Sequence, residues 1–104
     1  MIDVGTIGSL KCEVALNKEL IFLNDKKTNK FCLRILQNCK RDLKELKSNL
    51  SKDRKVYLRF IHLLRKSTFS LKDKKPDFIS EYGFSLLLCC LNAYFADAVR
   101  NTED

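Results

Sequence analysis

Only one proline and three glycines interrupt the 104 residues of this chain. An all-β protein of this length would need a turn about every 8–12 residues, and Gly and Pro are among the main turn formers. The shortage of these residues therefore favours long helices. Hydrophobic residues make up 45% of the chain and charged residues 32%, which is typical of a globular protein and not of a disordered one. We predict an all-α protein with one hydrophobic core.

Segment 28–50 carries the clearest helical pattern. Phe31, Leu33 and Ile35 broaden its apolar side in the first half only, so we expect that half to be buried on a wide front. The second half should contact a neighbour along a narrow seam. Thr28 is the predicted N-cap. The main apolar stripe recurs at alternating spacings of four and three, typical of one face of a helix, and comprises Cys32, Leu36, Cys39, Leu43, Leu46 and Leu50.

Polar N-caps indicate two further helices. Ser9 is the predicted start of the first, and the pattern allows either one helix of about 15 residues or two short helices divided at Asn17. Ser51 is the predicted start of the helix 51–66. Asp53 lies in its first turn, where a carboxylate suits the positive end of the helix dipole.

The C-terminal part of the chain begins with a predicted loop. The Lys-rich stretch 71–76 ends at the single proline and should lie outside any helix. A short turn over 77–82 should follow, and Gly83 is expected to break or bend the chain.

Residues 84–99 form the last predicted helix, with its large apolar side chains on one side. A membrane span needs about 20 apolar residues, and Asn92 and Asp97 interrupt this run. We therefore expect a helix buried in the core and no membrane span.

These segments add up to four or five helices, arranged as a compact bundle or as a short helical-repeat-like array. The helices 28–50 and 51–66 should pack antiparallel because their connection is so short. We expect one helical domain over residues 1–104, either the whole protein or the N-terminal module of a longer one, with residues 1–8 as a flexible lead-in. The N-terminus has no signal-peptide pattern, so we expect an intracellular protein, in the nucleus or the cytoplasm.

The cysteines and the single histidine give little support to a metal site or a catalytic site. No CxxC pair occurs among the five cysteines, and all five are predicted to be reduced, with Cys32, Cys39, Cys89 and Cys90 in the core. His62 has no orienting acid at helical spacing. No phosphate-loop, dinucleotide, zinc-protease or nucleophile-elbow pattern is present. We expect a non-enzymatic protein without a cofactor or a catalytic metal.

Positive charge is concentrated in the middle of the chain. Residues 26–75 hold 17 Lys and Arg against 4 Asp and Glu, whereas the segments before and after them are net acidic. Helical spacing gathers much of this charge into one row on each middle helix, and two neighbouring rows would form one basic face, the candidate partner-binding site. The rows are Lys30, Arg34, Arg41 and Lys44 on the first helix, and Lys55, Arg59, His62 and Lys66 on the second.

Three interpretations of this basic face stay open. A solvated face usually mixes both signs of charge, whereas acids are scarce here. A row of cations suits a phosphate backbone through counterion release, and it suits an acidic peptide equally well. The sequence offers no recognition-helix cluster and few aromatics outside the core arcs, so nucleic acid would be bound without sequence preference.

The leading functional hypothesis is a protein–protein interaction domain, an adaptor or scaffold. It would dock an acidic or amphipathic helical segment of another protein, or of a second copy of the chain. The seam at Leu43, Leu46 and Leu50 is one place where a partner helix could continue the packing. The alternative is a sequence-nonspecific nucleic-acid-binding domain that uses the basic helical face.

Overall fold

Four α-helices form a bundle in the computed structural model, which describes residues 4–50 and 52–101 and the side chains within 8–50 and 52–101. They are α1 (Val4–Leu23), α2 (Lys26–Leu50), α3 (Arg54–Phe69) and α4 (Glu81–Arg100), with a short 3₁₀ turn, η1 (Ser70–Asp73), after α3. Within the described residues there is no strand. The prediction of an all-α bundle of four or five helices is confirmed.

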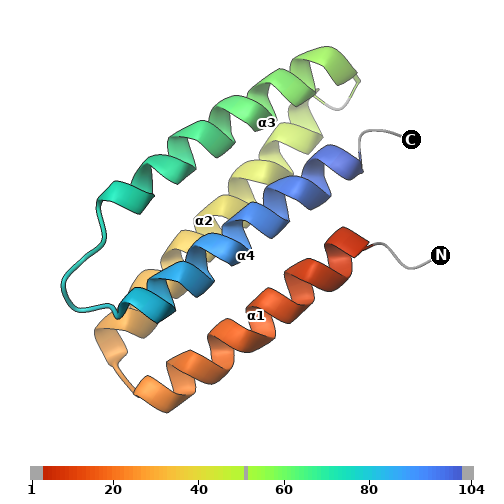
Figure 1. Cartoon of the computed structure of the whole chain (residues 1–104). Coiled ribbons are helices and arrows are strands. Elements are labelled where there is room, and N and C mark those ends of the chain that lie inside the picture. The colour runs from red at the N-terminus through yellow and green to blue at the C-terminus, as the bar shows by residue number, and fades with distance from the viewer. Residues whose placement is uncertain (1–3, 51, 102–104) are drawn as a thin grey trace.

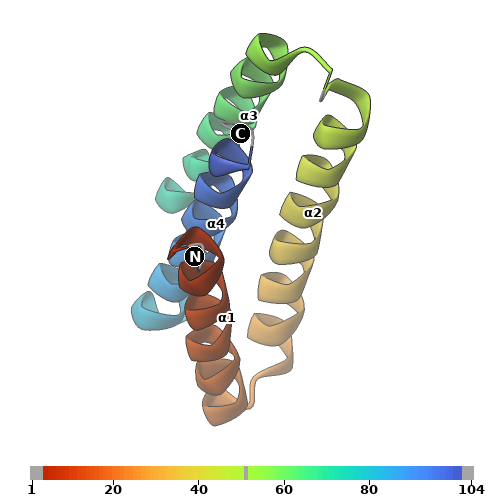
Figure 2. The ribbon, with the colours of Figure 1, turned by 90° about the vertical axis from the view of Figure 1, so that its right-hand side faces the viewer.

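The central element of the bundle is α4. It lies between α1 and α3, and these three helices form one layer (Figure 1). The helix α2 lies against this layer, where it contacts α3 and α4 (Figure 2). The molecule is accordingly flattened, with extents of 42 × 31 × 19 Å. Neighbours joined by short links run antiparallel, as predicted for α2 and α3.

The core is built around α4, which contributes more buried side chains than any other helix. Leu87, Leu91 and Phe95 have almost no exposed surface, and Leu16 of α1 and Ile61 of α3 pack beside them. By length and composition alone α4 could also cross a membrane, as the core helix of a bundle often could. The remaining buried core residues are Leu20, Cys32, Leu36, Cys39, Tyr57, Ile79, Phe84, Cys90 and Tyr94.

The first helix is longer and more regular than predicted. It begins at Val4, so residues 4–8 are helical and are not a lead-in, while residues 1–3 lie outside the described part of the chain. Ser9 is therefore no N-cap; it lies inside α1 and is buried. Asn17 does not divide the helix, because an exposed Asn costs a helix only a few tenths of a kcal/mol. Asn24 ends α1 in the left-handed region, with φ of 50°, which Asn tolerates better than most residues.

Asp25 caps the second helix in place of the predicted Thr28. Its carboxylate accepts a hydrogen bond from the Lys27 amide at 3.3 Å, and α2 begins at Lys26. The buried Thr28 hydroxyl lies within hydrogen-bond distance of the same carboxylate and, at 3.2 Å, of the Phe78 carbonyl. Thr28 thus ties α2 to the loop before α4, a contact between residues 50 positions apart that sequence spacing could not indicate.

The N-cap of α3 and its last residue both differ from the prediction by a few positions. Asp53 is the N-cap of α3 and accepts a hydrogen bond from the Val56 amide at 3.2 Å, while Ser51, the predicted cap, lies outside the described residues. The helix α3 continues past its predicted end at residue 66 to Phe69, whose ring packs against Phe95 with centroids 6.3 Å apart.

Gly83 does not break the chain, contrary to prediction. It lies in the first turn of α4, where its amide donates a hydrogen bond to the Ser80 hydroxyl at 2.9 Å. A Cβ atom at position 83 would come 3.0 Å from that hydroxyl oxygen and 3.6 Å from Ile79. The glycine therefore allows a close N-terminal turn.

Candidate interaction surfaces

All eight residues of the predicted basic face are exposed, and they lie in two separate places. On α2, Lys30, Arg34, Arg41 and Lys44 lie opposite the buried stripe, so they point away from the rest of the bundle. On α3, His62 lies beside Arg65, and both line a hollow of about 380 Å³ between α3 and α4. The Arg65 guanidinium donates a hydrogen bond to Asn92 of α4 at 3.3 Å.

Within this row His62 lies towards α4, whereas the residues of α3 that line the surface towards α2 are Phe60, Leu63 and Leu64. Lys55, Arg59 and Lys66 follow His62 by helical periodicity. The surface between the two basic rows is lined by apolar and acidic side chains from both helices. The structure does not bring the two predicted rows together into one ridge.

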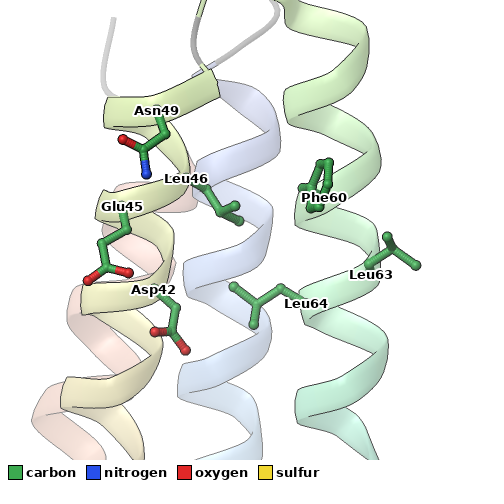
Figure 3. Close-up of a pocket in the computed structure, with 7 residues that line it drawn as sticks. All are labelled: Asp42, Glu45, Leu46, Asn49, Phe60, Leu63 and Leu64. Carbon is green, nitrogen blue, oxygen red and sulfur yellow. The ribbon is translucent and has the colours of Figure 1, made fainter.

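The surface between the rows is a groove of about 450 Å³ between α2 and α3, which we call the α2/α3 groove. Figure 3 shows Leu46 and Leu64 extending into the space between the two helices, with Phe60 beside them. Phe60 and Leu63 retain 43% and 55% of their surface exposed. The full lining is Asp42, Glu45, Leu46, Asn49, Phe60, Leu63 and Leu64.

The charged residues that line this groove are both acidic. Asp42 and Glu45 stand one turn apart on α2 (Figure 3). The Asp42 carboxylate lies 3.7 Å from the Arg41 guanidinium at the edge of the basic row. The groove thus combines an apolar interior with an acidic rim, inside the most basic part of the sequence.

One residue of the predicted seam on the second half of α2, Leu46, lines the groove, whereas Leu43 lines a separate hollow between α2 and α4. Leu43, Leu46 and Leu50 are only half-buried, whereas Cys32 and Cys39 in the first half of the stripe are buried. The second half is thus less buried than the first, but the predicted wide front of the first half is only partly right, because Leu33 is 43% exposed.

A second apolar surface, which the sequence patterns did not predict, covers the outer side of α1. Leu10, Val14 and Ile21 are 57%, 52% and 78% exposed, and Phe22 beside them is 82% exposed. Their opposite side, with Leu16, packs against α4. The signal was present in the sequence, because the apolar residues of α1 occupy both sides of a helix and do not form one stripe. We call Leu10, Val14 and Ile21 the α1 outer face.

A polar contact links three helices near the middle of α2. The Tyr94 hydroxyl of α4 donates a hydrogen bond to the Glu13 carboxylate of α1. The Lys40 ammonium of α2 lies 2.8 Å from the same carboxylate and 5.2 Å from the centroid of the Tyr94 ring. Because these side chains are partly exposed, the contact orients the helices more than it stabilises them.

The cysteines are free thiols; Cys32, Cys39 and Cys90 are buried, whereas Cys89 is exposed. Burial raises the pKa of Cys32 to about 11 and those of Cys39 and Cys90 to about 12. Cys89 is exposed, so its predicted place in the core is wrong. Adjacent helical residues point about 100° apart, and the core takes only one of the pair.

Among the residues that the structure describes, no group of three or more His, Cys, Asp or Glu side chains could hold a metal ion. His62 is exposed on α3. Comparison with known proteins found no matching family model, no matching curated protein and no matching solved structure.

Proposed function

We propose that this protein is a non-enzymatic interaction module whose α2/α3 groove binds a basic amphipathic helix of a partner protein. The observation that carries the proposal is the lining of the groove, in which Leu46, Phe60, Leu63 and Leu64 form an apolar patch beside two carboxylates. Helix-in-groove recognition needs such a hydrophobic trough for residues at i, i+3, i+4 and i+7 of the guest.

The acidic rim selects the charge of the guest helix. Asp42 and Glu45 lie on the α2 wall, so Lys or Arg residues that flank the apolar stripe of a guest would meet opposite charge there. Leu46 and Leu64 would contact the stripe itself. Exposed ion pairs of this kind contribute orientation and association rate more than affinity.

A fluorescent, designed peptide of about 18 residues tests the proposal, with Leu on one helical face and Lys on its flanks. We expect saturable binding in fluorescence anisotropy, and amide chemical-shift changes concentrated in 42–49 and 60–64. Leu63→Glu should weaken binding by about tenfold or more, since it puts a charge into the apolar contact.

Two controls make this test specific. Tyr82→Glu changes a side chain with the same exposed fraction as Leu63, 55%, outside the groove, and it should bind the peptide normally. A peptide of the same composition with its Leu residues dispersed should bind weakly. Shift changes that gather on the α2 and α3 basic rows and spare the groove would overturn the proposal.

The alternative, nonspecific nucleic-acid binding, has less support. The two basic rows are exposed, but a groove with acidic residues separates them, so a phosphate backbone would meet one row at a time. Titration of a DNA duplex at two salt concentrations separates the two functions. Strong salt-dependent binding that is lost in the triple variant Lys55→Glu, Arg59→Glu, Lys66→Glu would favour nucleic acid.

A further inference from the structure

We infer that the α2/α3 groove accepts the α1 outer face of a second copy of this chain, giving a head-to-tail association. The inference rests on the proposed function and names one occupant of the groove. It starts from the fact that both surfaces are apolar, uncovered and on the same molecule. Exposed apolar surface in contiguous patches marks interaction sites.

The two surfaces match in shape. On the α1 outer face, the exposed Leu10 and Val14 lie one turn apart and line a hollow of about 380 Å³. The groove residues 42–49 span about 10 Å along α2, which is about two helical turns. Leu10 and Val14 therefore suit the length of the groove, and the exposed Leu63 suits the hollow between them.

The two surfaces also match in charge. Lys11 and Lys18 line the hollow on α1 and are exposed. Asp42 and Glu45 line the groove. The lysines stand about 10 Å apart along the helix, and their long flexible stems let the ammonium groups converge on the two carboxylates.

A symmetric pairing of α1 with α1 is disfavoured by the same charges. In an antiparallel pair centred near Val14, Lys11 of one copy would face Lys18 of the other, so like charges would lie side by side. The groove offers opposite charge to the same lysines. The two surfaces also lie at different places on the bundle, because α1 and α3 are opposite edges of the layer (Figure 1). The contact is therefore heterologous, and it can extend beyond two copies.

The expected association is weak. A contact of about two helical turns buries less than the roughly 800 Å² per partner that is typical of stable complexes. Sedimentation velocity should therefore show the average mass rising between about 10 µM and about 1 mM protein. It should also show that added salt reduces this rise.

Two single variants give the decisive test. Val14→Glu damages the α1 outer face, and Leu63→Glu damages the groove. Both side chains are more than half exposed, so the fold should tolerate the changes. Each variant alone should remain monomeric over the concentration range. An equimolar mixture should form a 1:1 heterodimer and nothing larger, since it contains one intact face and one intact groove.

Other outcomes of the mixing experiment would overturn the inference. If the contact were α1 with α1, the Leu63→Glu variant would still associate and mixing would restore nothing. Tyr82→Glu should associate like the unmodified chain, and its loss of association would point to a general charge effect. A monomeric unmodified chain would refute self-association, whereas the groove function would stand if the designed peptide still bound the Val14→Glu variant.

A charge exchange checks the assigned contact independently. Lys18→Glu should weaken association by about fivefold, in the range of an exposed ion pair with added repulsion. Combining it with Glu45→Lys on the same chain should restore most of the loss. No restoration would place Lys18 outside the groove and refute the arrangement.

Discussion

The two halves of α2 carry the same apolar repeat but are buried to different extents. In the first half, Cys32, Leu36 and Cys39 are buried among α1, α3 and α4 residues of the core. In the second half, Leu43 and Leu46 keep part of their surface exposed along the same stripe. The difference shows that periodicity decides which side of a helix turns inward, whereas the neighbours decide how far that side is covered.

The cover differs because the two ends of α2 have different neighbours. The start of α2 is held by Thr28, which contacts the loop before α4, and by Phe31, whose ring meets Phe78 edge-on at 5.7 Å. Towards its end, α2 lies beside α3 and the end of α4 (Figure 2). This part of α2 lines the α2/α3 groove. The candidate function thus belongs to the half that packs less tightly.

The largest expected difference between the two halves of α2 is in the free energy of unfolding that an alanine substitution costs. Leu36→Ala should lower the free energy of unfolding by about 2–4 kcal/mol, because it removes buried surface and leaves a cavity. Leu46→Ala should cost only about 1 kcal/mol, since its side chain is only partly buried. Urea unfolding measures both values. Equal losses would mean that the groove wall contributes to the core as fully as the first half does.

Because Cys32 and Cys39 are buried in the first half of α2, the protein should lose stability at alkaline pH. Burial raises the pKa of Cys39 from its ordinary value of 9.0 to about 12 and that of Cys32 to about 11. A raised thiol pKa contributes stability that is complete below pH 9 and is lost as the pH climbs towards the folded value.

Urea unfolding at pH 7 and near pH 10.5 tests this pH dependence. The fall in stability between the two pH values should be smaller for Cys39→Ala than for the unmodified chain, even though this variant starts less stable. The exposed Cys89 supplies the matched control, and Cys89→Ala should follow the unmodified chain. An unchanged pH profile for Cys39→Ala would contradict the assignment.

Removing the N-cap of α3, which follows the less buried half of α2, should have an effect of intermediate size on the free energy of unfolding. Asp53→Ala removes the acceptor of the Val56 amide hydrogen bond and should cost about 1 kcal/mol in unfolding experiments. Asp53→Asn keeps an accepting oxygen and should recover most of the loss. If Asn recovered nothing, the negative charge near the helix dipole would be the main contribution.

The smallest expected effect on stability is at Lys40, at the boundary between the two halves of α2. Lys40→Met removes the ion pair with Glu13 and keeps the aliphatic stem, so the loss of stability should stay below about 1 kcal/mol. Because Lys40 also lies near the Tyr94 ring, high salt should remove part of this difference but not all of it. Chemical denaturation at two salt concentrations measures it, and a loss of several kcal/mol would show a stronger coupling between α1 and α2.

Sequence patterns predicted local features of this protein well and surfaces less well. The repeat from Cys32 to Leu50 predicted α2 and its buried side, and the short connection predicted that α2 and α3 are antiparallel. The observed N-caps, Asp25 and Asp53, are not the predicted residues, because several neighbouring polar side chains could each act as an N-cap. The predicted basic rows are exposed but separate, since the rotation of α3 against its neighbours is a tertiary property.

The sequence by itself determined that this chain is helical, the approximate positions of α2, α3 and α4, and which residues are apolar enough for a core. Those features depend on interactions within a few residues, namely helical periodicity, capping and the scarcity of turn formers. Only the tertiary structure decided that α4 is central, that the α1 outer face stays bare and that a groove opens between α2 and α3. These depend on how three or four helices share a limited apolar surface, and no single helix contains that information.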